Sequence, residues 1–549
     1  MENQKKKKYT LGLDFGTLSV RCVIADECGK DIAEASSAYM HGVMDKELPS
    51  GVKLPPRFAL QHPADYLFCA KAAIKEALVA SALSPSDIVG VGIDFTACTM
   101  LAVDEKLVPL CLRDEFANEP HAYAKLWKHY GATDEAKLIN DVARERGEEW
   151  LSLYGGYVSP EWMLPKILET LNKAPVVYDA TYRFVEAGNW LTWLLTGNER
   201  HCIDFVGYKT FWNEKEGYPS DEFMAALDPR LSGIVGTKIS KSVIGAAECV
   251  GHLTAHGASL LGLCEGAAVA SAYMDAHAAL PTLGITKPGE LMLIVGTSSV
   301  QLIHAPELKT FKGLLGCVKD AFIKGLYTYE AGQAAVGDIF DWFVKNCVPA
   351  AYEKEAEELG IGIHKLLRDK ALRLEIGESG LIALDWHNGN RSPLTDPTLC
   401  AMMLGMKLGT RPEEMYRAWL EASAFGTRSI LESFAAGGIY VDRIVASGGI
   451  ALKDELLMQI YADVLGKDIE VSSSSQAAAH GSAALAAVAA GIYPDIKAAS
   501  EAFTKPIYRI YKPIQNNVEK YTILYNEYKI LQDYFAGGAN DVMKRLTKF

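Results

Sequence analysis

Three short stretches of the chain place glycine beside hydroxyl or carboxyl side chains at the end of an apolar segment. The first is "YTLGLDFGTLSVRCVIAD", in which Asp14, Gly16 and Thr17 separate two apolar segments. A turn between strands favours Asp and Gly for conformational reasons alone, so a plain hairpin is one interpretation. The other is a site where a carboxylate, bare backbone and a hydroxyl group meet a metal-bound phosphate. This turn alone leaves both interpretations open.

The other two stretches repeat the pattern later in the chain. "GELMLIVGTSSVQLIHA" places Gly296, Thr297 and Ser298 between two apolar segments, and "DRIVASGGIA" places Gly448 and Gly449 between a strand and a helix. None of the three stretches matches the Walker P-loop or the dinucleotide-binding glycine pattern. Two such hairpins followed by a glycine turn form the order found in actin-like ATPase (ribonuclease H-like) lobes. This order predicts an α/β fold of two similar lobes with a catalytic cleft between them.

Three charged residues stand in otherwise apolar or aromatic surroundings. Asp275 lies in "ASAYMDAHAALP", Glu330 in "YTYEAGQAAVGDIFDWF" and Lys209 in "VGYKTFWN". An unpaired carboxylate is costly to bury, so Asp275 is expected to be paired or functional, although it could also begin the following helix. Helix capping is the simpler interpretation of Glu330, and a surface lysine with a buried stem is the simpler interpretation of Lys209.

Length, charge and cysteine usage limit the class of protein. A chain of 549 residues is too long for one core and predicts two or three domains. The net charge of −13 argues against nucleic acid or an anionic membrane as the main partner. Eleven scattered cysteines without zinc-type spacing indicate reduced, buried thiols. "MENQKKKKYT" lacks a following apolar segment and is expected to be a solvated tail, so a cytoplasmic location is predicted.

Hydrophobic periodicity predicts the elements that hold these stretches in place. Strands alternate with helices in the first 110 residues, residues 120–250 are rich in helix, and a second alternating region begins near residue 289. The predicted elements are hairpins over 9–26, 98–110 and 289–305, strands over 87–95 and 442–451, and helices over 63–81, 161–173, 184–197, 453–466 and 516–535, with an Ala-rich helix after His480.

Longer stretches of the sequence resemble the FGGY family of carbohydrate kinases. They include "GVGIDFTACTMLAVDEKLVPLC", "YGGYVSPEWMLPKILETL", "GLIALDWHNGNRSPLTDP" and "RIVASGGIALKDELLMQIYADVLG". The segment around Lys166 resembles one family signature, and the segment 401–421 resembles the other, with Trp419 where a smaller residue is usual. The resemblance implies an N-terminal lobe over 1–265, a C-terminal lobe over 266–500 and a helical extension over 501–549.

The same resemblance implies a role for individual residues. Asp275 would be the catalytic base and would also contact the sugar. The other implied roles are Mg²⁺ binding by Asp14, phosphate binding by Gly16, Thr17, Gly296, Thr297 and Ser298, adenosine binding by Gly448, Gly449 and Lys453, and sugar binding by Ala97, Lys209 and Glu330. Ser271 and Ala272 stand where many relatives have a glycine ahead of the aspartate, which raises a question about the geometry of that loop.

The implied activity is Mg²⁺- and ATP-dependent phosphorylation of L-ribulose to L-ribulose 5-phosphate, as in L-arabinose catabolism, because "DFTACT" and "KLWKH" resemble the branch of the family that acts on this sugar. The expected partners are therefore a sugar and ATP, with homodimer formation left open. Three alternatives stay open at this point: a kinase for another ketopentose or a pentitol, an actin-like switch ATPase, and a catalytically silent sugar sensor.

Overall fold

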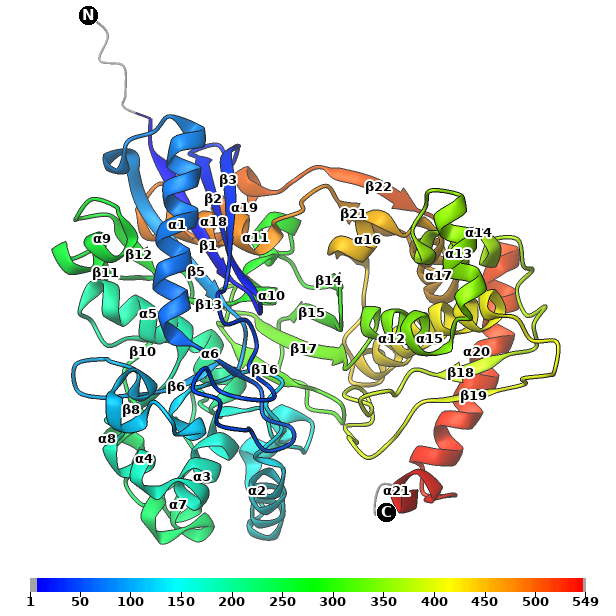
Figure 1. Ribbon diagram of the computed structural model, residues 1–549, viewed down its shortest axis with the longest axis horizontal. Helices are drawn as coiled ribbons and strands as arrows, with labels where there is room; N and C mark the ends of the chain where they lie inside the picture. Colours follow the sequence, from blue (N-terminus) through cyan, green and yellow to red (C-terminus); the bar gives the residue numbers. More distant parts are fainter. Residues whose placement is uncertain (1–6, 547–549) are drawn as a thin grey trace, which may run out of the picture. The chain divides into compact units, whose positions relative to one another are not determined.

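The computed structural model describes residues 7–546 of the chain and divides it into two compact units (Figure 1). The first unit comprises the residues up to 286 together with 317–328 and 476–504. The second comprises 287–316, 329–475 and the residues from 505 onward. The two lobes predicted over 1–265 and 266–500, and the helical extension predicted over 501–549, are continuous segments, and their assignment to functions stays a prediction. Of the tail expected over residues 1–10, residues 1–6 lie outside the described residues, whereas Tyr9 and Thr10 belong to the first strand of the sheet and are not part of a solvated tail.

A mixed sheet forms the centre of the first unit. Its strand order is β11-β12-β5-β1-β2-β3, and β13 pairs with β5 at the end of that strand. β1 and β2 form an antiparallel hairpin, whereas β5 runs parallel to β1 and β12 runs parallel to β5. The bounds are β1 Tyr9–Phe15, β2 Ser19–Asp26, β3 Asp31–Ala38, β5 Ile88–Phe95, β11 Cys249–His252, β12 Ala268–Ala270 and β13 Tyr273–Met274.

The sheet of the second unit repeats this arrangement. It runs β17-β15-β14-β20-β21-β22, with an antiparallel β14·β15 hairpin, β20 parallel to β14, and β21 parallel to β20. The bounds are β14 Glu290–Val295, β15 Ser299–Ala305, β17 Tyr327–Gln333, β20 Arg443–Ser447, β21 Ile469–Ser472 and β22 Ile507–Tyr511. A hairpin extended by two parallel strands therefore occurs in both units, and the two hairpins lie where the sequence predicts them.

Small residues set the distance between sheet and helix in the first unit. The Ala-rich helix α18 (Ala477–Ala489) packs on β1 and β5. A Cβ atom at Gly12 would lie only 1.8 Å from the Ala479 carbonyl oxygen, so only glycine permits this approach. The chain thus returns to the first unit through a helix that covers the strands bearing Asp14 and Asp94.

Both units also contain many helices, which Figure 1 shows. Those of the first unit include α1 Pro63–Ser81, α2 Thr133–Arg146, α3 Met163–Lys173, α5 Ala187–Thr196, α6 Ile203–Lys209, α9 Ala255–Leu261, α10 Asp275–Ala278 and α19 Ile496–Phe503. Those of the second include α12 Gly337–Cys347, α13 Ala350–Glu358, α14 Ile363–Ala371, α15 Pro412–Ala436, α16 Gly449–Lys453, α17 Glu455–Leu465 and α20 Gln515–Ala536.

Most predicted elements are present, and four need correction. The strand predicted over 442–451 ends at Ser447, because the residues from Gly449 onward form helix α16. The helix predicted over 184–197 begins only at Ala187, because Arg183–Glu186 forms β8, which pairs with β6 (Met100–Val103). That pairing replaces the second strand of the hairpin predicted over 98–110, of which a single bridge between Val103 and Pro109 remains. The helix predicted after His480 starts earlier, at Ala477.

The cysteines agree with the expectation only in part. All eleven lie among the described residues and form no disulfide there, but Cys28, Cys249, Cys264 and Cys347 are exposed rather than buried. Within residues 7–546, every helix is too short or too polar to cross a membrane.

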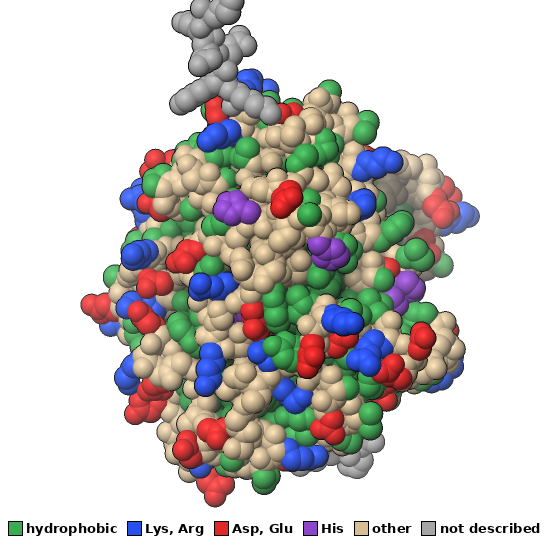
Figure 2. Space-filling model, turned by 90° about the vertical axis from the view of Figure 1, so that its left-hand side faces the viewer, with side chains coloured by type: hydrophobic (Ala, Val, Ile, Leu, Met, Phe, Trp, Pro, Cys, Tyr) green, Lys and Arg blue, Asp and Glu red, His purple; other side chains and the backbone are tan. Residues whose placement is uncertain are grey.

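Figure 2 shows one face of the molecule, on which acidic and basic side chains are interspersed and do not form separate acidic and basic patches.

Candidate active site

Three carboxylates meet at one edge of the first unit's sheet. Asp14 lies on β1 directly opposite Asp94 on β5, and Asp94 in turn pairs in register with Tyr273 on β13. Asp275 follows β13 immediately as the first residue of α10. Because these three strands are parallel to one another, their carboxyl ends, and the acids on them, come to the same edge. We call Asp14, Asp94 and Asp275 the acid cluster.

Negative charge is in excess within the acid cluster. Arg21 Nη1 donates to Asp14 Oδ2 at 2.9 Å, and Ser482 Oγ donates to Asp94 Oδ2 at 2.6 Å. Burial raises the pKa of Asp14, although Arg21 and a hydrogen bond with Asp94 oppose this. Burial and the charge of Asp14 hold the pKa of Asp94 well above its usual range. One arginine facing three acids leaves a net negative site, which suits a divalent cation.

Asp275 is half-buried, and hydrogen bonds fix its carboxyl group and the residue before it. Its Oδ1 accepts the backbone N–H of Ala276 at 2.8 Å, and the preceding residue, Met274, donates its N–H to Asp204 Oδ2 at 2.8 Å. Burial, and then the charge of Asp14, raise the pKa of Asp275 to about 6. A carboxyl group with this pKa is ionised near neutral pH and is still basic enough to accept a proton.

The first glycine turn joins β1 to β2 beside the acid cluster. Gly16 N–H donates to the Ser19 carbonyl oxygen at 3.0 Å and closes the turn. Two side chains from other elements hold Thr17: Trp127 Nε1 donates to its Oγ1 at 3.2 Å, and Gln61 Nε2 donates to its carbonyl oxygen at 2.8 Å. Side chains from outside the hairpin therefore hold this turn in place. A turn that only connects two strands does not need such contacts.

The loop containing Ala97 is held by a buried lysine. Lys166 Nζ donates to the carbonyl oxygen of Cys98 at 2.5 Å and to that of Leu126 at 2.7 Å. Cys98 adopts a left-handed conformation with φ of 58°, so the loop turns sharply after Ala97. Ala97 itself is half-buried. The loop to which the resemblance assigns sugar binding is thus held in place by the Lys166 side chain.

Lys209 ends helix α6 and is only 3% exposed, so its interpretation as a surface lysine is wrong. Its Nζ lies 5.7 Å from the ring centre of Trp162 and 5.6 Å from that of Tyr208. Tyr208, an aromatic neighbour in the sequence, and Trp162, which is distant in the sequence, therefore both lie near the ammonium group.

Sequence reasoning missed Arg21, Asp94 and Glu186. Arg21 and Asp94 stand in quoted segments, and their importance follows only from the strand register that brings them to Asp14. Glu186 lies on β8 opposite Met100 and is 1% exposed. Neither of its carboxylate oxygens has a hydrogen-bond partner among the described residues. Burial raises its pKa to about 7, although the charges of Lys166 and Lys209 oppose this.

The second unit brings two glycine turns to one edge of its sheet. β14 ends at Val295, before Gly296, and runs parallel to β20, which ends before Gly448. Gly296 O accepts the N–H of Gly337 at 3.0 Å, and Thr297 O accepts the N–H of Val336 at 2.8 Å, so the start of α12 joins this edge. Thr297 is exposed and Ser298 is half-buried.

Gly448 and Gly449 form the start of α16. Gly448 has φ of 110°, and a Cβ atom there would lie 2.4 Å from the Val295 carbonyl oxygen, so this position requires glycine. A Cβ atom at Gly449 would meet open space, which leaves bare backbone accessible. Lys453 ends α16 and is exposed.

Glu330 lies within β17 and is 8% exposed, so its interpretation as a helix cap is wrong.

The departure at Ser271 and Ala272 is accommodated within the first unit. Ser271 Oγ donates to the Gly245 carbonyl oxygen at 3.0 Å, and Ser271 and Ala272 are both buried.

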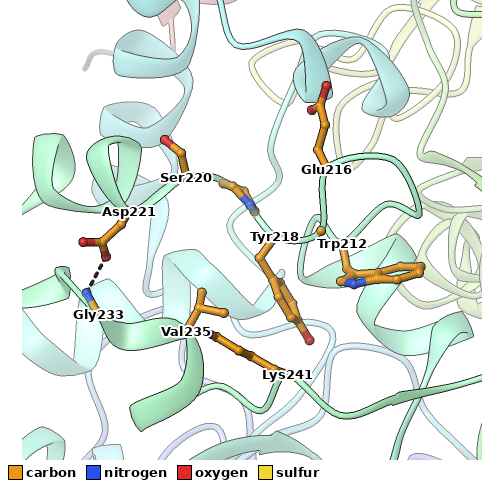
Figure 3. A pocket seen from close by; sticks show the side chains of 10 residues that line it. Trp212, Glu216, Tyr218, Ser220, Asp221, Gly233, Val235 and Lys241 are labelled. Atoms are coloured by element: carbon orange, nitrogen blue, oxygen red, sulfur yellow. Dashed lines mark hydrogen bonds between the residues drawn. The ribbon is translucent and has the colours of Figure 1, made fainter.

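A separate hollow of about 520 Å³ lies over residues 212–241 and includes Trp212, Tyr218 and Lys241 (Figure 3). Asp221, on its rim, accepts the N–H of Gly233. None of the predicted site residues is among those that line this hollow.

Comparison with known proteins identifies the family of this chain. The model of the FGGY family of carbohydrate kinases, N-terminal domain, matches residues 9–281, and the C-terminal domain of the same family matches residues 291–490. The chain belongs to the FGGY family of carbohydrate kinases. It is a carbohydrate kinase, and a kinase of this family uses ATP.

Individual relatives extend over the whole chain. The ribulokinase of Geobacillus thermodenitrificans is 47% identical over 545 residues, which cover 98% of this chain and 97% of the relative. The ribulokinase of Mycolicibacterium smegmatis is 44% identical over 542 residues, which cover 98% and 96%. Among solved structures, a xylulose kinase from Rhodospirillum rubrum matches with a TM-score of 0.77 at 22% identity, covering 96% of this chain and 98% of that one.

A gluconate kinase from Lactobacillus acidophilus matches with a TM-score of 0.78 at 17% identity, covering 97% of this chain and 99% of that one. These two structures establish the fold alone: an α/β fold with two actin-like lobes.

Proposed function

We propose that this FGGY kinase transfers the γ-phosphoryl group of ATP to the 5-hydroxyl group of L-ribulose and releases ADP and L-ribulose 5-phosphate, a step of L-arabinose catabolism. The observation that carries this proposal is the 47% identity to a ribulokinase over nearly the full length of both chains. It is supported by the raised pKa and partial accessibility of Asp275, which suit a group that accepts the proton of a hydroxyl nucleophile.

In this proposal, the sugar oxygen forms a bond to the γ-phosphorus while the bond to the bridging oxygen of ADP breaks. The sugar hydroxyl proton passes to the carboxylate of Asp275. Ala97, through its backbone, and the side chains of Lys209 and Glu330 would orient the sugar. Because an analogue that lacks a matching hydroxyl would leave a buried polar group unpaired, such contacts give selectivity among sugars.

Asp14 is the residue we assign to Mg²⁺, through water. The excess of carboxylates over arginine in the acid cluster supports this, since Mg²⁺ binds proteins through one or two carboxylates and keeps several waters. The ion would neutralise charge on the phosphates. The turns at Gly16–Thr17 and at Gly296, Thr297 and Ser298 would donate backbone N–H groups to the phosphates, and Gly448, Gly449 and Lys453 would bind the adenosine.

The test is the selectivity of the purified protein among sugars. With saturating Mg-ATP, kcat/KM is measured for L-ribulose, D-ribulose, D-xylulose, ribitol and glycerol, and ³¹P and ¹H spectra locate the phosphate on the product. We expect L-ribulose to give the highest kcat/KM and the product to carry phosphate on C5. A higher kcat/KM for D-xylulose, ribitol or glycerol would reject the substrate but keep the kinase. A cytoplasmic location and a homodimer both stay predictions.

A further inference from the structure

Two histidines and an aspartate gather beside the start of α1, outside the acid cluster. His41 follows β3, His62 directly precedes α1, and Asp65 lies in the first turn of that helix. His41 donates its backbone N–H to Asp65 Oδ2 at 2.9 Å, and its Nδ1 lies 2.9 Å from Asp65 Oδ1. The rings of His41 and His62 stack with their centres 4.3 Å apart. We call these three residues the histidine cluster.

The donor atoms of the histidine cluster match those of a transition-metal site. Each residue offers one ligand atom, and these three atoms all lie within 4.8 Å of one another. Two imidazoles and a carboxylate are typical ligands of Zn²⁺ and of its neighbours in the first transition row. His62 Nδ1 is buried and has no hydrogen-bond partner among the described residues, so a ring nitrogen of this residue is not engaged by the protein.

The spacing of the ligand atoms suits one ion. Ligands at about 2.0–2.2 Å from a single Zn²⁺ ion lie roughly 3 Å from one another. The separation of 2.9 Å between His41 Nδ1 and Asp65 Oδ1 already meets this condition. A rotation of the His62 ring would bring its nitrogen to the third position. The His41 side chain is 27% exposed, which gives an ion access from solvent.

We propose that His41, His62 and Asp65 form a binding site for a divalent transition-metal cation of the Zn²⁺ type, with water at the open positions. This site is distinct from the Mg²⁺ position assigned to Asp14, because imidazole ligands favour transition metals whereas Mg²⁺ prefers oxygen.

The site would act on the first glycine turn through Gln61. Gln61 precedes His62, donates its Nε2 to the Thr17 carbonyl oxygen at 2.8 Å and accepts the hydroxyl of Tyr66, next to Asp65, at 2.7 Å. An ion that links the loop at His41 to the start of α1 would therefore stiffen the segment that holds Thr17.

Calorimetric titration of the full-length, chelator-treated protein with Zn²⁺, in excess Mg²⁺ and without nucleotide, tests this site. We expect one saturable site per chain, and an increase in its Kd of at least about tenfold in H41N and in H62N. H256N is the matched control, because His256 is an exposed histidine on α9, and it should bind as the wild type does.

Thermal unfolding of the same proteins provides the second measurement. Zn²⁺ should raise the Tm of the wild type and of H256N but not that of H62N, since an ion bound only by the native state stabilises it. Unchanged Zn²⁺ affinity in H62N, or a wild type without a saturable site, would overturn the proposal. If H62N does not fold, the visible spectrum of the Co²⁺-loaded wild type decides, because the proposal requires d–d bands of imidazole-bound Co²⁺ and their absence rejects it.

Discussion

Two buried groups of charged residues in the first unit differ in their balance of acids and cations and in the direction in which their pKa values shift. In the acid cluster, carboxyl groups outnumber cations, and the pKa of each acid is raised. In the second group, which we call the lysine network, Glu169 accepts Lys125 Nζ at 2.7 Å and His129 Nε2 at 2.8 Å. Burial alone would raise the pKa of Glu169, but Lys125 and His129 outweigh burial and hold this pKa far below its usual range.

The difference separates charges that support the fold from charges that serve a ligand. Glu169 and Lys125 are fully buried, paired and hydrogen-bonded, so removing one partner would leave the other uncompensated. The acid cluster has more carboxyl groups than protein cations. A metal ion or a transferred proton would reduce this excess of negative charge. We therefore expect substitutions in the lysine network to change stability and substitutions in the acid cluster to change rate.

The largest expected effect is on the rate of Asp275→Asn. Loss of the proton acceptor should lower kcat by about 10²–10⁴-fold, because general-base assistance contributes this much. The Kd values for ATP and sugar should stay close to those of the wild type, and the Tm should not fall, because burial already disfavours the charged carboxylate of Asp275. The measurement is steady-state kinetics with calorimetric binding, and Asp134→Asn, at an exposed site in α2, is the control. Turnover like that of the wild type would remove Asp275 from the mechanism.

Glu169→Gln should give the opposite result. Breaking a buried ion pair from one side costs about 3–5 kcal/mol, so the free energy of unfolding of the first unit should fall by this amount. The kcat of the protein that remains folded should be unchanged. Chemical denaturation followed by intrinsic fluorescence measures the change, with Glu149→Gln, whose side chain is 82% exposed, as the control. A loss of kcat without a loss of stability would contradict the comparison.

Glu186 tests a buried acid whose carboxylate oxygens lack a hydrogen-bond partner within residues 7–546. Its folded pKa of about 7 lies above the value of about 4.3 for an unfolded chain, so its contribution to stability is fully present below that lower value and is lost as pH rises through about 7. Glu186→Gln removes this loss, and the variant should exceed the wild type in stability at pH 8 by up to roughly 3 kcal/mol, with a smaller difference at pH 5.

Urea unfolding of wild type and Glu186→Gln at both pH values measures this difference, and Glu222→Gln, at an exposed position, should show none. An equal stability difference at pH 5 and pH 8 would mean that Glu186 keeps an ordinary pKa.

The smallest expected effect is that of Ser482→Ala. The variant loses one hydrogen bond, to Asp94 Oδ2, and such bonds contribute about 1 kcal/mol to stability. Because Asp94 does not touch the reacting atoms in our proposal, kcat should change by less than roughly threefold. Thermal unfolding and steady-state kinetics measure both effects, with Ser259→Ala, at an exposed site, as the control. A large loss of kcat would show that Asp94 does more than support Asp14.

The sequence predicts the strands and turns of both units well, because each glycine turn follows an apolar segment with clear periodicity. It marks Asp14 as a candidate by the glycine turn that follows it, and Asp275 because a lone acid in apolar surroundings is unusual. It does not predict Asp94 or Arg21, whose roles depend on strand register, nor the burial of Lys209. Glu186 is hidden for a different reason: its segment has helical spacing, yet β8 forms there because pairing with β6 outweighs local preference.

The most direct test of the account is the pH dependence of phosphoryl transfer in a single turnover, measured for wild type and Asp275→Asn with saturating Mg-ATP and L-ribulose. The base must be ionised, so the wild-type rate should fall as pH drops through about 6 and should be level above it. In Asp275→Asn the residual rate should show no such fall. An acid limb that persists unchanged in the variant would contradict the assignment of Asp275 as the proton acceptor.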